Sequence, residues 1–270
     1  MARHSSRREG THVVPLARHQ VLVLIGMLAL LAGILMYGLS YVLVTNLGPR
    51  TTYPHSTPAE KTADDVVRRR DAIAAAPMAT VAQDAATTPG VALALPSPML
   101  LPAAGWAGPD GVPTGFPQSP GGAAAQLAAI EVRVLSAMSL PLTRGVYSDW
   151  ALPGGVGARD WSQSHNVQSF LTHARQSSNT LDPGTLVNVA LAAIQIKGTD
   201  GPDWVLACVL LDVRAALLKE ARMGYGTCER MQWTGERWLI GPGAPPSPAR
   251  SAWPGSDASV AAGWLPVTPS

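Results

Sequence analysis

The chain has 270 residues with 26 glycines, 24 prolines and only 14% charged residues. This composition indicates a membrane segment, a Pro/Gly/Ala-rich linker and one modest folded domain. The formal net charge is +2. Residues 1–20 alone carry about +3, so the remaining residues sum to about −1. A nucleic-acid-binding domain is therefore not expected, because it would carry a basic face on its folded part.

Residues 21–45 contain no charged side chain and are long enough, as a helix, to cross a bilayer. A cleaved signal peptide is the alternative, but the run exceeds the usual apolar core and lacks a small-residue cleavage site. The preceding tail carries the basic residues expected on the cytoplasmic side. These membrane-orienting residues are Arg3, Arg7, Arg8 and Arg18. The sequence thus predicts a single-pass signal anchor in the plasma membrane, in contact with lipid through 21–45, with the C-terminal part outside.

Residues 46–118 are expected to form a juxtamembrane helix over 59–76 and then a tether. The tether is rich in Pro, Gly and Ala and has no Lys or Arg between Arg70 and Arg133. Such a segment buries too little apolar surface to offset the entropy cost of ordering it. We therefore expect a disordered linker that holds the next domain away from the bilayer.

Residues 119–243 predict an extracytoplasmic α+β domain, two helices packed on a curved antiparallel sheet of about four strands. Ser119 and Pro120 begin the first helix, and Pro141 is expected to end it. A turn-rich stretch over 139–155 and a second helix over 158–176 follow. The expected strands are 185–197, 203–215, 221–233 and 236–242. Residues 244–270 are expected to be an irregular tail.

Cys208 and Cys228 are the only cysteines. If 203–215 and 221–233 form a hairpin centred near residue 218, the two cysteines stand opposite each other on neighbouring strands. A disulfide is then possible outside the cytoplasm. Two buried thiols packed as small apolar side chains are an equally good interpretation.

No catalytic, metal or cofactor site is predicted. His165 and His173 are eight residues apart with no further ligand at metal spacing. Asp149 and Asp160 flank a Gly-rich turn and could serve as a general base, although capping and turn roles are commoner. Glu229 and Arg230 are expected on the exposed face of a hairpin.

Three tryptophans on neighbouring strands allow two interpretations. Trp204, Trp233 and Trp238 either belong to the core between sheet and helices or form a partner-binding face. Burial in the core is the commoner arrangement for such tryptophans. A tethered domain that shows no catalytic motif instead favours the partner-binding interpretation.

Three stretches carry a resemblance to actinobacterial single-pass membrane proteins linked with mobile or conjugative elements. They are PTGFPQSPGGAAAQLAAI (113–130), GTDGPDWVLACVLLD (198–212), and CERMQW (228–233) with Arg237 and Trp238. The layout also resembles the bitopic subunits of type IV secretion and conjugation channels, which carry a nuclear-transport-factor-2-like domain. This resemblance implies scaffolding without catalytic residues.

The sequence therefore predicts a membrane-anchored interaction subunit of a transfer or secretion assembly. Its expected partners are other membrane or cell-envelope proteins, including further copies of itself. Two alternatives stay open: a pocket-containing binding protein or enzyme with the same cone-like fold, and a membrane-bound regulator.

Overall fold

The computed structural model describes residues 58–216 and 220–269. The predicted tail at 1–20 and the predicted span at 21–45 lie outside these residues. Within the described ranges, no helix is both long and apolar enough to cross a membrane.

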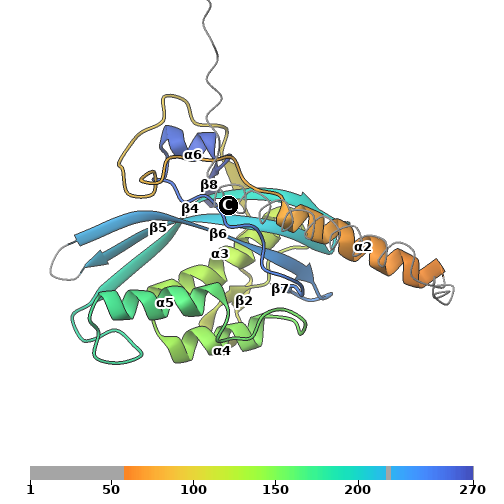
Figure 1. Ribbon diagram of the computed structural model, residues 1–270, viewed down its shortest axis with the longest axis horizontal. Helices are drawn as coiled ribbons and strands as arrows, with labels where there is room; N and C mark the ends of the chain where they lie inside the picture. Colours follow the sequence, from red (N-terminus) through yellow and green to blue (C-terminus); the bar gives the residue numbers. More distant parts are fainter. Residues whose placement is uncertain (1–57, 217–219, 270) are drawn as a thin grey trace, which may run out of the picture. The chain divides into compact units, whose positions relative to one another are not determined.

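A six-stranded sheet forms the centre of the domain, with the order β1-β8-β4-β5-β6-β7 (Figure 1). All of its neighbouring pairs are antiparallel except β1 with β8. The strands are β1 (Met99–Leu101), β4 (Leu186–Thr199), β5 (Trp204–Ala216), β6 (Glu220–Trp233), β7 (Trp238–Ile240) and β8 (Leu265–Pro269). A separate two-stranded ladder joins β2 (Trp106–Ala107) to β3 (Pro113–Thr114) around the 3-10 turn η1 (Pro109–Gly111). The α+β class with a curled, mainly antiparallel sheet is confirmed, and the expected count of four strands is wrong.

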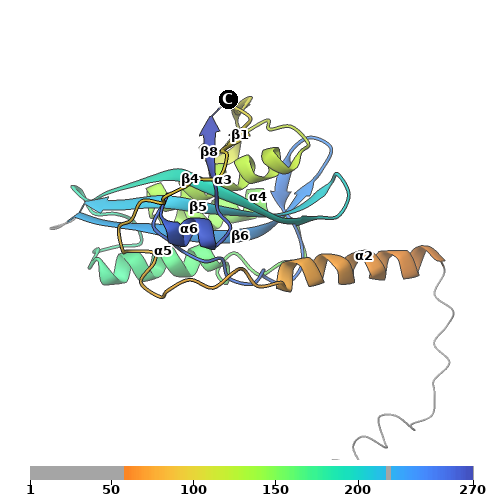
Figure 2. The same cartoon turned by 90° about the horizontal axis from the view of Figure 1, so that it is seen from above.

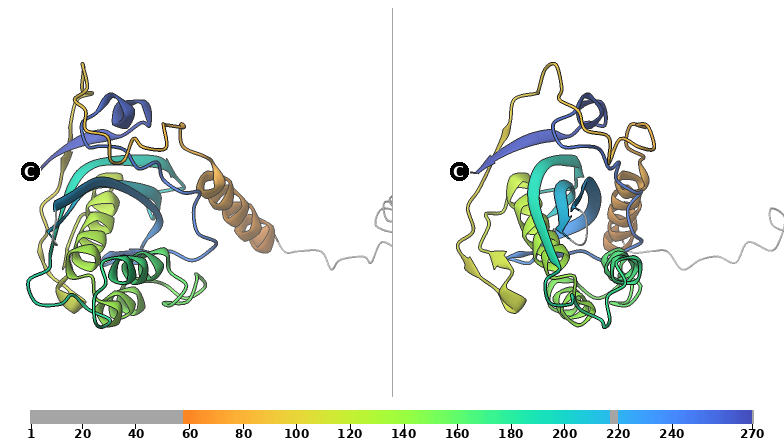
Figure 3. Two further views of the ribbon diagram at one scale, coloured as in Figure 1. Left: turned by 60° about the vertical axis from the view of Figure 1, so that its left-hand side comes forward. Right: turned by 90° about the vertical axis from the view of Figure 1, so that its left-hand side faces the viewer.

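Three helices lie under the concave face of the sheet, as Figures 1 and 3 show. They are α3 (Pro120–Ala137), α4 (Leu140–Trp150) and α5 (Ser162–His173). Register shifts at Leu191/Ala193 and Ile196/Gly198 place two irregularities in β4. Such bulges bend a strand and increase its twist, so the sheet can curl around α3.

The segment at 139–155 was expected to be turn-rich, and it contains α4 instead. α3 ends where Met138 adopts a left-handed conformation with φ 40°. Ser139 then caps α4 by accepting a hydrogen bond from the Leu142 amide. Pro141 lies in the first turn of α4, where its missing N–H costs nothing, so it starts a helix there.

The convex face of the sheet is covered by chain from both ends of the described range (Figure 2). α2 (Pro58–Ala75) places Ala74 against Trp204 and Leu206 of β5. The tether expected over 77–118 is packed on the domain instead. Several of its apolar side chains are buried, including Met78, Ala85, Leu101, Val112 and Phe116. A Pro/Gly-rich stretch becomes ordered here because scattered apolar residues dock on an existing sheet.

The tail expected to be irregular contains α6 (Asp257–Ala261) and β8. Trp264 is buried beside the Cys208–Cys228 pair, and its indole N–H donates to the Arg250 carbonyl. Gly224 of β6 allows this close packing, because a Cβ at that position would collide with the Ala252 carbonyl oxygen.

Candidate functional site

Polar side chains occupy the part of β6 that faces the helices. Tyr225, Thr227 and Glu229 alternate along the strand and point to that side, while Cys228 between them packs on the convex face. Thr227 and Glu229 are buried. Because a buried polar group costs free energy unless it is hydrogen-bonded, this row needs partners from the helices.

α5 supplies those partners. The indole N–H of Trp161, at the N-cap of the helix, donates to Oε1 of Glu229 at 2.8 Å. The Gln163 amide lies 3.1 Å from the Tyr225 hydroxyl, and Asn166 donates to the same hydroxyl at 2.7 Å. The start of α5 is therefore joined to the middle of β6 by a hydrogen-bonded network.

α3 adds a second buried acid. Glu131 has no exposed surface, and neither of its carboxyl oxygens has a hydrogen-bond partner among the described residues. It lies within an otherwise apolar stretch of α3 that includes Leu127 and Val134. We call Glu131, Gln163, Tyr225, Thr227 and Glu229 the polar network.

The surroundings of the two acids favour their protonated forms. Burial, followed by the charge of Glu229, raises the pKa of Glu131 well above its usual value, while the nearby Gln163 side chain favours the ionised form. Burial raises the pKa of Glu229 to about 7, although the Trp161 hydrogen bond and the charge of Arg230 favour its ionised form. Two buried carboxyls that repel one another do not ionise together, so this pair retains a proton near neutral pH.

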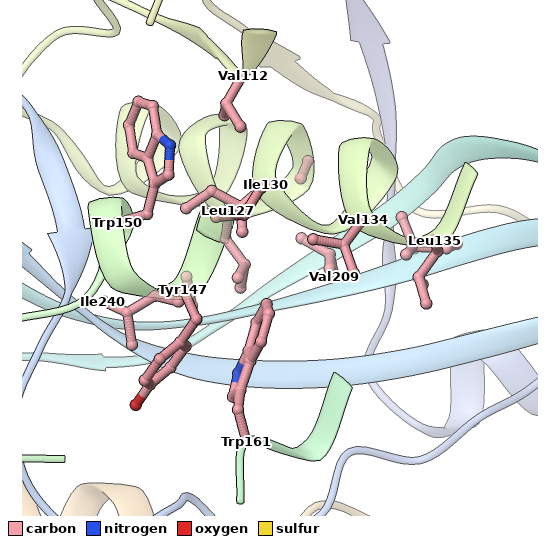
Figure 4. Close-up of a cluster of buried hydrophobic side chains, with 14 of the residues drawn as sticks. Val112, Leu127, Ile130, Val134, Leu135, Tyr147, Trp150, Trp161, Val209 and Ile240 are labelled. Atoms are coloured by element: carbon pink, nitrogen blue, oxygen red, sulfur yellow. The ribbon is translucent and has the colours of Figure 1, made fainter. Parts of the chain in front are cut away.

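A cavity of about 210 Å³ opens beside Glu229. Tyr147 of α4 and Trp161 form part of its wall, with ring centroids 4.9 Å apart. The two rings lie next to each other below α3, near Ile240 (Figure 4). Segment 241–246 contributes the wall opposite the helices. We call this space the Glu229 cavity.

An apolar surface provides a second candidate, over residues 91–106. Among the described residues, eight large apolar side chains are exposed, and five of them belong to this stretch. They are Val91 (86% exposed), Leu93 (98%), Leu95 (55%), Leu100 (65%) and Trp106 (55%). Figure 3 shows the stretch, in yellow, running along one side of the domain from beside α6 toward α4. We call it the 91–106 surface.

An apolar groove of about 320 Å³ adjoins this surface at β1. Leu101, Phe116 and Leu191 are among the residues that line it. β1 is the outermost strand of the sheet, so one of its edges has no strand partner within the part of the chain that the structure describes.

The tryptophans predicted as a possible partner-binding face are mostly core. Trp204 and Trp238 are 1% and 0% exposed. Trp238 donates its indole N–H to the Pro117 carbonyl at 2.9 Å and packs edge-on against the half-buried Trp233. The partner-face interpretation is therefore wrong for Trp204 and Trp238, because the helix layer and α2 cover both faces of the sheet.

The structure separates the candidate acid and base residues. Asp160 and His165 line the Glu229 cavity, whereas Asp149 is exposed and does not. His173 is exposed at the end of α5, where its ring bonds to Ser169. Within residues 58–216 and 220–269, no three His, Cys, Asp or Glu side chains are grouped as metal ligands would be.

The predicted cysteine register is confirmed. Cys208 pairs with Cys228 in the β5–β6 ladder, with Cα atoms 4.0 Å apart, and the two form a disulfide. The bond lies on the convex face among Met78, Ala262 and Trp264.

Glu229 and Arg230 were expected to be exposed, and both are buried. Glu229 faces the helices, and Arg230 reaches the opposite side to pair with Asp71 of α2 at 2.8 Å. Side chains two residues apart on a strand point to the same face. Glu229 therefore shares a face with the apolar Met231, and this relationship would have assigned Glu229 to the covered side of β6. Glu131 could have been noticed as the one acid within the apolar stretch of α3.

The comparisons with known proteins identified no relative. No protein-family model, curated protein or solved structure matches the chain significantly.

Proposed function

We propose that this protein is a membrane-anchored, extracytoplasmic interaction subunit that binds an envelope protein through the 91–106 surface. The observation that carries the proposal is the concentration of exposed apolar side chains in that one stretch. Large exposed apolar patches are uncommon on monomeric proteins and mark interaction sites.

The geometry next to that surface favours an extended, apolar segment as the occupant. β1 offers the free backbone edge of a sheet, and a peptide strand can add to such an edge. The adjoining groove, which Leu101 of β1 and Val267 of β8 help to line, adds apolar surface close to that edge. We therefore assign the partner as a neighbouring envelope protein that contributes a strand.

Two further observations support a location outside the cytoplasm. The Cys208–Cys228 disulfide is a bond that persists in oxidising compartments. The uncharged run over 21–45, with arginines before it, agrees with an anchor of that orientation. The proposal also includes the finer expectations of a nuclear-transport-factor-2-like fold and a conjugative transfer or secretion assembly, both of which rest on the resemblance.

The test is a binding comparison between matched surface variants. The double variant Leu93→Ser/Leu100→Ser should weaken association with the native partner by roughly tenfold or more. Leu186→Ser is the control, because Leu186 is 64% exposed at the start of β4, outside the 91–106 surface. Equal association of all three proteins with the partner would reject the proposed surface.

A further inference from the structure

The two outer strands of the sheet differ in how their edges are covered. β7 is buried along its whole length, and the amide of Leu152 donates to the Ile240 carbonyl at 2.8 Å, so the chain between α4 and α5 closes that edge. β1 pairs with β8 on one side and makes no other backbone-to-backbone hydrogen bond to the described residues. Leu100, in the middle of β1, is 65% exposed. Within the part of the chain that the structure describes, the open edge of the sheet is therefore the one at β1.

Two prolines limit the length of this open edge. Pro98 and Pro102 stand on either side of β1 and lack the N–H group that would donate to a further strand. Leu100 lies midway between them, with one residue of β1 on each side. A second copy of β1, placed antiparallel, has the same length and also ends at prolines. It would set Leu100 opposite Leu100, and Met99 of each copy opposite Leu101 of the other.

The absence of charge around this edge also favours a second copy. Residues 85–109 contain no Asp, Glu, Lys, Arg or His. A two-fold contact brings the same part of both copies together, so any charge at its centre would meet a like charge and repel it. Surfaces that bind anionic lipid present Lys and Arg instead, and the sequence has neither between Arg70 and Arg133. The 91–106 surface is therefore compatible with itself and poorly suited to a charged membrane surface.

We propose that the partner of the 91–106 surface is a second copy of this chain, joined by antiparallel β1–β1 pairing across a two-fold axis at Leu100. This inference rests on the proposed function, because it identifies the occupant of the same surface. The pairing would close the open edge of both copies and join their six-stranded sheets into one. Leu100 of each copy would pack against Leu100 of the other. The proposed anchor would hold both copies in one membrane, which raises their effective concentration.

The first test is a cysteine crosslink with the full-chain variant Leu100→Cys. Opposed side chains on antiparallel strands have Cβ atoms about 4.5–5.5 Å apart, close enough for a disulfide to form. The two native cysteines are already bonded to each other, so the added thiol is the free one. Two differently tagged copies of the variant are produced in the same cells and oxidised with copper phenanthroline. We expect a product of twice the chain mass that carries both tags, and no such product from Leu186→Cys, whose native side chain is 64% exposed outside this surface.

The outcomes separate this inference from the proposed function. A product that joins Leu100→Cys to a different protein would overturn the second-copy assignment and leave the 91–106 surface as a binding site. No product from Leu100→Cys would also overturn the second-copy assignment. The proposed function itself fails only if Leu93→Ser/Leu100→Ser keeps full association with the native partner.

A pair of charged variants provides a second test that needs no covalent bond. In a two-fold contact, Leu100→Asp or Leu100→Lys alone sets like charges against each other, so each should self-associate roughly tenfold or more weakly than the native chain. An equimolar mixture of the two sets opposite charges together and should recover most of the lost affinity. Analytical ultracentrifugation of the full chains in a non-ionic detergent measures both effects. A monomeric native chain, or a mixture that associates no better than either variant alone, would contradict pairing at Leu100.

Discussion

Trp161 donates its indole N–H to Glu229 across 2.8 Å, and this bond joins the N-cap of α5 to the centre of β6. Both residues are buried, with 2% and 8% of their surface exposed. The bond satisfies one oxygen of an acid that would otherwise be costly to enclose.

The burial of Glu229 predicts a characteristic pH dependence of stability. Its pKa rises from the usual 4.5 to about 7 on folding, so folding favours the protonated form. The stabilisation from this group is therefore complete below about pH 4.5 and is lost as pH rises through about 7. Glu229→Gln should remove this part of the dependence and be more stable than the native protein at pH 8, by up to about 3 kcal/mol.

Urea unfolding followed by tryptophan fluorescence at pH 5, 6, 7 and 8 measures this effect. Parallel stability profiles for the native chain and Glu229→Gln would show that Glu229 does not titrate differently on folding. Glu131→Gln provides the comparison for the second acid, whose pKa is raised by burial and by Glu229.

The Cys208–Cys228 disulfide is expected to stabilise the domain. The two cysteines are separated by 20 residues, and closing a loop of that length restricts the unfolded chain by about 3 kcal/mol. Reduction, or the double change Cys208→Ala/Cys228→Ala, should therefore lower the free energy of unfolding by about 2–4 kcal/mol. Non-reducing mass spectrometry of the protein isolated from its native cells checks the bond itself, and two free thiols would contradict it.

Two arginines of α2 hold this helix against the sheet. Arg70 donates from Nε to Asp200 at 2.9 Å, and Arg69 pairs with the other oxygen of the same carboxylate. The hydrogen bond from Arg70, with further help from Arg69, lowers the pKa of Asp200. Arg70→Ala should loosen α2 and increase amide hydrogen exchange over 63–75.

Arg68→Ala is the matched control for that experiment. The Arg68 side chain is 73% exposed and, among the described residues, pairs with Asp65 of its own helix, whereas Arg70 is 25% exposed. Exposed pairs within a helix contribute little, so exchange in this control should equal that of the native chain. The same increase in both variants would show that α2 is not held by Asp200.

The strand pattern and the cysteine register could be predicted because they depend on local spacing. The long strands β4, β5 and β6 agree with the predicted segments to within two residues, and Cys208 faces Cys228 as expected. The alternation of inward and outward side chains and the position of each turn determine these features between strands that are neighbours in the sequence.

The coverage of the convex face could not be predicted by the same means. It depends on the pairing of β1 with β8, two strands that lie more than 160 residues apart in the sequence. It depends equally on single apolar residues in a Pro/Gly-rich stretch that has no helical or strand periodicity. Trp204 illustrates the consequence, because its burial depends on Ala74 and Ile73 of α2, far away in the sequence.

The polar network was missed for a related reason. Glu131 and Glu229 are far apart in the sequence, and each resembles an ordinary surface acid in its own element. Only the packing of α3 and α5 on β6 brings them together with Gln163 and Tyr225.

The most direct measurement of the proposed function is site-specific photo-crosslinking in intact cells that produce the protein. A photoreactive amino acid replaces Leu93, which is 98% exposed in the 91–106 surface, and Leu186 serves as the control position. We predict a discrete adduct from position 93 with one envelope protein, lost when Leu100→Ser is added, and no such adduct from position 186. The same products from both positions, or none from position 93, would contradict the assignment of this surface to partner binding.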